Sequence, residues 1–142
     1  MKTKLLLMLV LLAGLVTSDS PLFAHHGAAA FDMSKPVVLK GATITEFLWI
    51  NPHPLIKADY KDEQGNVQNW TMEMGSTASA KLLGWSRTTL SYGDVVTLYV
   101  WQAKTKAPVG RFNKVEFADG TVMRDTQTGA DDGGRADTEV RP

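Results

Sequence analysis

The sequence predicts a mainly β domain, a small OB-like barrel of five to six strands with one short helix between strands 3 and 4. Three observations lead to this fold: a long first β-prone segment that contains a glycine, a pair of segments typical of a hairpin, and a short helical segment before the last strands. A plain β-sandwich is the alternative arrangement of the same elements.

The first β-prone segment runs from Val37 to Ile50 and is rich in Val, Ile, Thr, Phe and Trp. Gly41 lies inside it and predicts a bulge or a bend. The sequence Asn51-Pro52-His53-Pro54 ends the strand, because proline cannot donate to a sheet ladder. We therefore expect His53 in a turn or at a strand edge.

The next two segments predict a hairpin. Leu55 to Asp62 alternates between apolar and polar residues, as a half-buried strand does. Glu63-Gln64-Gly65-Asn66 forms a turn, and a second strand follows from Val67 to Met74. Alternate residues of this second strand share one face and are predicted to lie in the core: Trp70, Met72 and Met74.

A helix is predicted over Ala78 to Leu83, with Ser76 as its N-cap and Gly84 as its end. Two or three strands are expected after it: Val95 to Ala103, Arg111 to Phe117 and a short segment from Thr121 to Met123. The turn signal Asp119-Gly120 leads into the last of them.

Composition narrows the class of protein. The chain has 142 residues, with 15 basic and 15 acidic side chains, and 44% of its residues are hydrophobic. This size and composition predict one globular domain, and the balanced charge gives no footprint for nucleic acid or anionic lipid. The chain has no cysteine, so disulfides, thiolate ligands and thiol nucleophiles are excluded, and any metal must be held by nitrogen and oxygen.

The N-terminal segment is typical of a secretory signal peptide, with a basic start at Met1 to Lys4, an apolar run from Leu5 to Val16 and a small residue, Ala24, at the cut. An uncleaved anchor is the alternative, although the run is shorter than the roughly 20 residues that span a bilayer. We expect a signal peptide over 1–24, the barrel over 25–123 and a disordered polar tail over 124–142. The mature protein is then periplasmic, without stable membrane insertion.

Short motifs spread over 25–123 resemble those of a family of small exported bacterial proteins known only as a domain of unknown function. The resemblance implies a periplasmic location, supports the fold and brings no activity. The chain departs from the family pattern at Gly27, where Ser is frequent, and in its long polar tail. The motifs are His25-His26, Phe31-Asp32, Lys35-Pro36-Val37, Asn51-Pro52-His53, Trp70, Gly75-Ser76, Gly84-Trp85 and Gly93-Asp94.

A metal site is the sharpest chemical hypothesis. The chain has three histidines, and cleavage after Ala24 places His25 at the mature N-terminus, where its α-amino group and ring chelate a metal together. His53, in its double-proline turn, is the candidate for an opposing ring. His26 serves in its place or beside it, and Asp32 is the nearest carboxylate, as an axial or outer ligand. Such a set suits copper. Zinc is the alternative with Asp32 as a ligand, but the terminal amine favours copper.

Other interpretations remain open. His53 is equally a turn residue whose ring bonds nearby backbone, and the two N-terminal histidines are equally a mobile terminus. No Gly-x-Ser-x-Gly motif or paired catalytic carboxylates are found, so we expect a non-enzymatic protein. The second hypothesis is a metal-free periplasmic accessory or interaction module that binds a partner protein or a small ligand on the barrel surface.

Overall fold

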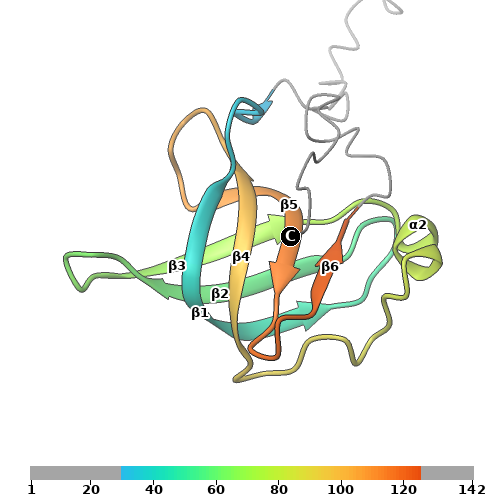
Figure 1. Cartoon of the computed structure of the whole chain (residues 1–142). Coiled ribbons are helices and arrows are strands. Elements are labelled where there is room, and N and C mark those ends of the chain that lie inside the picture. Colours follow the sequence, from blue (N-terminus) through green and yellow to red (C-terminus); the bar gives the residue numbers. More distant parts are fainter. Residues whose placement is uncertain (1–29, 126–142) are drawn as a thin grey trace, which may run out of the picture.

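The computed structural model describes residues 30–125 (Figure 1). The predicted signal peptide, His25 and His26, and the tail from residue 126 onward lie outside this range. The described elements, in chain order, are β1 (Val37–Leu48), β2 (Leu55–Lys61), β3 (Val67–Glu73), α2 (Thr77–Leu82), β4 (Val95–Gln102), β5 (Val109–Glu116) and β6 (Val122–Arg124).

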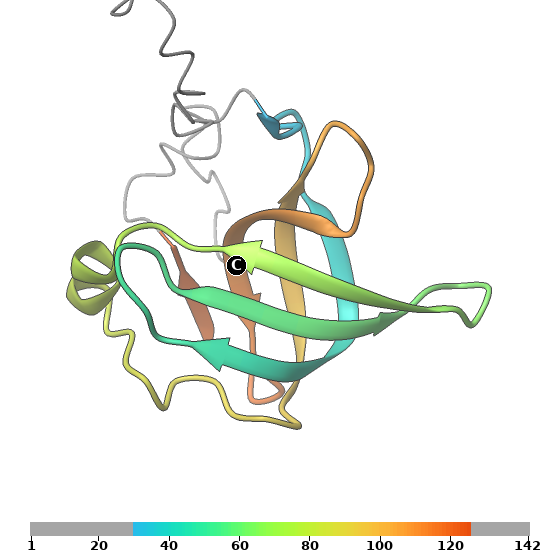
Figure 2. The same ribbon diagram turned by 180° about the vertical axis from the view of Figure 1, so that it is seen from behind.

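The strands form one sheet that closes on itself. Its order is β3-β2-β1-β4-β5-β6, with antiparallel neighbours, and β3 also pairs with β5. This extra pairing is parallel, joins Thr71–Glu73 to Val109–Arg111, and completes a five-stranded barrel to which β6 adds at the edge of β5. The predicted OB-like barrel, with its helix between strands 3 and 4, is therefore confirmed, and the sandwich alternative is wrong (Figures 1 and 2).

A bulge in β1 divides it into two halves that pair with different neighbouring strands. Its first half pairs with β4 and its second half with β2. The register against β4 shifts between Leu39 and Ala42, and Gly41 between them has a φ of 71°, which favours glycine. The predicted bend at Gly41 is thus confirmed.

The barrel interior is filled by the apolar faces of all five closed strands. Met72 and Met74 are fully buried there, so these methionines are core residues, as the alternation predicts. Trp85 follows α2 and is also buried, edge-on against Phe112, with its indole N–H donating to the carbonyl of Arg124 at 2.8 Å. The other core residues include Leu39, Ala42, Ile44, Ile56, Ala58, Trp70, Val96, Leu98, Val100 and Val115.

The bounds of α2 and β6 differ slightly from the prediction. Helix α2 has the predicted N-cap, since the Ser76 side chain accepts from the amide of Ser79, but it starts one residue earlier, at Thr77. Strand β6 continues to Arg124, and Asp125 behind it is buried. Ordered, packed structure therefore extends two residues into the segment that composition assigns to the tail. Within 30–125, no helix is long and apolar enough to cross a membrane.

Candidate functional site

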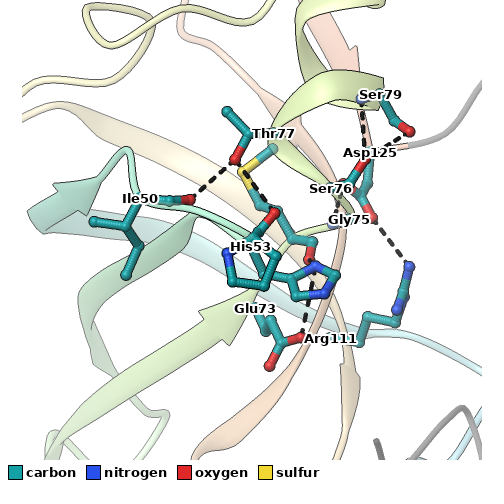
Figure 3. A network of polar contacts seen from close by, with 11 residues as sticks. Ile50, His53, Glu73, Gly75, Ser76, Thr77, Ser79, Arg111 and Asp125 are labelled. Carbon is teal, nitrogen blue, oxygen red and sulfur yellow. Dashed lines mark hydrogen bonds and ion pairs between the residues drawn. The ribbon is translucent and has the colours of Figure 1, made fainter.

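The loop that contains His53 is fastened to the segment that leads into α2. The amide of Met74 donates to the carbonyl of Pro54 at 2.9 Å, and the amide of Thr77 donates to that of Pro52 at 3.0 Å. These bonds continue the β2–β3 ladder beyond its last pair, Leu55 with Glu73. The loop 51–54, which we call the Asn-Pro-His loop, is consequently held against residues 74–77 (Figure 3).

The side chain of Thr77 makes two further contacts with this part of the chain. It is buried, and its hydroxyl faces the carbonyl oxygens of Ile50 and Pro52, at 3.0 and 3.2 Å (Figure 3). Buried polar groups of this kind are costly to leave without a partner. Thr77 therefore joins the first turn of α2 to the loop on both sides of Asn51.

Replacing Thr77 with valine keeps the volume but removes the hydroxyl, so we expect a loss of about 1–2 kcal/mol in the free energy of unfolding. The amide of Thr77 should also exchange faster with solvent, because the Asn-Pro-His loop that accepts its hydrogen bond is less firmly held. Urea denaturation and hydrogen exchange measure the two effects. Thr105→Val, on an exposed loop, is the control. Unchanged stability and exchange in Thr77→Val would contradict this role.

The ring of His53 is oriented by the backbone of residue 74. Its Nδ1 lies 3.1 Å from the carbonyl oxygen of Met74. A carbonyl only accepts, so Nδ1 carries the proton and, in the neutral ring, the lone pair belongs to Nε2. The carboxylate of Glu73 is also near, with Oε1 at 3.9 Å from Nδ1, and 31% of the His53 side chain is exposed. The ring is thus held in one tautomer at the surface of the barrel.

Asp125 lies on the other side of the same backbone segment. Its carboxylate oxygens accept from the amide of Gly75, at 2.7 and 3.0 Å, and one of them lies 3.6 Å from Nη2 of Arg111 (Figure 3). The amide of Asp125 donates to the carbonyl of Asn113, which places the residue one step past the end of β6. The sequence did not indicate Asp125 or Arg111 as site residues. Asp125 comes two residues after the last predicted strand, Thr121 to Met123, and the only signal was its acidic side chain close to that strand end.

Asp32 is elsewhere. Its amide donates to the carbonyl of Gln102 at the end of β4, and its carboxylate accepts from the hydroxyl and the amide of Ser34 and from Lys106 at 3.4 Å. The hydrogen bond from the Ser34 hydroxyl, more than the other contacts, lowers the pKa of Asp32. The segment around residue 32 and the Asn-Pro-His loop lie apart in both ribbon views (Figures 1 and 2).

The structure therefore does not bring the predicted ligand Asp32 to His53. His25 and His26 lie outside the described residues. Among residues 30–125, no three His, Asp or Glu side chains form a group that could hold a metal ion.

The model of one protein family matches residues 13–112, and this family is described as one of unknown function (DUF6152). The match confirms the resemblance to an uncharacterised family. Searches of curated proteins and of solved structures find no match to the chain. The chemistry must therefore be argued from the residues themselves.

Proposed function

The chain belongs to this family of unknown function (DUF6152), and on that premise we propose that the mature protein is a non-enzymatic periplasmic copper-binding protein. His25 supplies its α-amino nitrogen and its ring, and His53 supplies Nε2 from the barrel. His26 gives a supporting contact. Asp32 is left out of the proposed ligand set, because its carboxylate is engaged by Ser34 and Lys106 away from the loop of His53.

The observation that carries this proposal is the hydrogen bond from Nδ1 of His53 to the carbonyl of Met74. Histidines that bind metals almost always donate their other ring N–H to a carbonyl or a carboxylate, which fixes the tautomer and the ring plane. The loop that carries His53 is itself bonded at Pro52 and Pro54 to Thr77 and Met74. A ligand preorganised in this way loses little entropy when it binds.

The donor set favours copper. Without cysteine, the available soft ligands are thioethers. Met72 and Met74 are fully buried in the core, and Met33 and Met123 are half-buried. An amine and imidazoles form a nitrogen-rich set that suits the tetragonal geometry of Cu(II). Five residues lead from His25 to Ala30, the first described residue, and an extended chain of that length reaches about 17 Å. This reach limits His25 to ligand positions within about 17 Å of Ala30.

Calorimetric titration of Cu(II) into the mature protein, produced to begin at His25, tests this function. We expect one-to-one binding that is at least about tenfold weaker in His53→Ala, which corresponds to about 1.4 kcal/mol. Two added residues before His25 remove the terminal amine and should weaken binding as well. Asp32→Asn is the matched control and should bind as the parent protein does. Equal affinity in the parent protein and in a folded His53→Ala would contradict the proposal.

A metal-free interaction module is the second candidate. The observation in its favour is that Leu82, the last residue of α2, and Tyr92, in the segment that joins α2 to β4, each expose 83% of their surface. Exposed apolar side chains of this size are candidates for contact with a partner. Copper affinity that is unchanged in His53→Ala would favour this candidate.

A further inference from the structure

One peptide group, between Met74 and Gly75, is hydrogen-bonded on both sides by side chains that are remote in sequence. Its carbonyl accepts from Nδ1 of His53 at 3.1 Å, and its N–H donates to both carboxylate oxygens of Asp125, at 2.7 and 3.0 Å (Figure 3). We propose that Asp125 is a positioning residue for His53, and that it acts through this single peptide group.

The physical basis is polarisation along a chain of hydrogen bonds. A carboxylate that accepts from an amide forms a charge-assisted bond, which is stronger than a bond between neutral groups. It draws the N–H toward itself, increases the negative charge on the carbonyl oxygen of the same peptide, and so strengthens the next bond in the chain. Because Asp125 is buried and the Gly75 contact is buried too, this effect is weakly screened.

The bond to Asp125 also fixes the orientation of the peptide plane. With its N–H held by Asp125, the Met74 carbonyl must point away from Asp125, toward the ring of His53. A carboxylate bonded directly to a ligating histidine is a known way to fix its tautomer. Here one peptide group separates the carboxylate from the ring, and the end of β6 is thereby connected to the Asn-Pro-His loop.

Two neighbours hold the carboxylate in place. Arg111 lies beside it, with Nη2 at 3.6 Å from Oδ2. Gly75 leaves the space that it needs, since a Cβ at that position would lie 3.2 and 3.3 Å from the two carboxylate oxygens. A side chain at residue 75 requires the carboxylate to give way by a few tenths of an ångström. Gly75→Ala therefore perturbs the contact between Asp125 and the amide without altering Asp125 or His53.

The consequence for the His53 tautomer is independent of any metal, whereas the consequence for copper rests on the proposed function. Long-range proton–nitrogen NMR of the metal-free mature protein, in buffer alkaline enough for neutral imidazoles, reads the tautomer directly. We expect the Nδ1–H form of His53 to dominate. In Asp125→Asn and in Gly75→Ala the Nε2–H form should rise severalfold, with the fold retained by its amide spectrum. Asp32→Asn should leave the ring signals unchanged.

Either of two results would overturn the proposal: a dominant Nε2–H form in the parent protein, or an unchanged tautomer in a folded variant. If Asp125→Asn fails to fold, Gly75→Ala carries the test. Copper affinity separates the two ideas, since an altered outer partner typically costs 10–100-fold in metal affinity. A shifted tautomer without copper binding supports the positioning role and rejects the copper function. Copper binding that needs His53, with an unshifted tautomer, supports the copper function and rejects the positioning role of Asp125.

Discussion

Asp125→Ala should lower the free energy of unfolding by about 2–3 kcal/mol, because it removes a charged acceptor from a buried amide and leaves that donor unsatisfied. The substitution deprives the Gly75 amide of both its acceptors and removes the anion that lies beside Arg111. A single domain is stable by only about 5–15 kcal/mol, so this loss is a large part of the total. It is also unexpected from the sequence, where residues 124–142 are typical of a disordered tail.

Urea denaturation, followed by tryptophan fluorescence, measures this loss. Glu63→Ala, at an exposed position of the β2–β3 turn, is the matched control for removing a carboxylate, and its effect should stay within about 0.5 kcal/mol. A loss below about 1 kcal/mol in Asp125→Ala would show that the carboxylate does not hold the end of β6 to the barrel.

Gly110→Ala should also be strongly destabilising, by about 3 kcal/mol, at the upper end of the cost of overpacking. Gly110 lies where β5 pairs with β4 on one edge and β3 on the other, opposite Gln102 and Met72. A Cβ at this position would clash with Cγ1 of Val100 and would lie 2.5 Å from the carbonyl oxygen of Trp101. The carbonyl belongs to β4, so it cannot retreat without disturbing the β4–β5 ladder that closes the barrel.

Gly41→Ala is the informative comparison for Gly110→Ala. A Cβ at Gly41 meets nothing within 4 Å, and the only cost comes from its φ of 71°, which is about 1–2 kcal/mol for a residue other than glycine. Thermal and urea unfolding of the two variants should rank Gly110→Ala as the more damaging. Equal losses would mean that the close approach of β4 and β5 is not what requires glycine at position 110.

Much of the fold could be predicted because its signals are local. The alternation of Leu55 to Lys61, the Ser76 cap and the glycine inside β1 are each visible within a few residues. The parallel pairing of Thr71–Glu73 with Val109–Arg111 closes the barrel, yet no short pattern encodes it, since it joins strands almost 40 residues apart. Only the likeness to an OB-like order of elements implied it.

The site was less predictable, for the same reason. The two prolines around His53 indicate a fixed turn, and the structure has one. The carbonyl that orients the ring belongs to Met74, which a sequence pattern assigns only to the core. Asp32 is the carboxylate nearest to His25 in sequence, but nearness along the chain does not determine nearness to His53. Asp125 was not predicted as a site residue, because the polar residues that follow it assign its segment to the tail.

The most direct test of the copper function is pulsed electron paramagnetic resonance of the mature protein loaded with one equivalent of Cu(II), because the remote nitrogen of each coordinated imidazole contributes to the spectrum. The comparison is between the parent protein and His53→Ala. We expect the parent spectrum to show more than one coordinated imidazole and the variant to lose one of them. Identical spectra would show that the barrel contributes no ligand, and that the N-terminal histidines bind copper as any exposed histidine tail does.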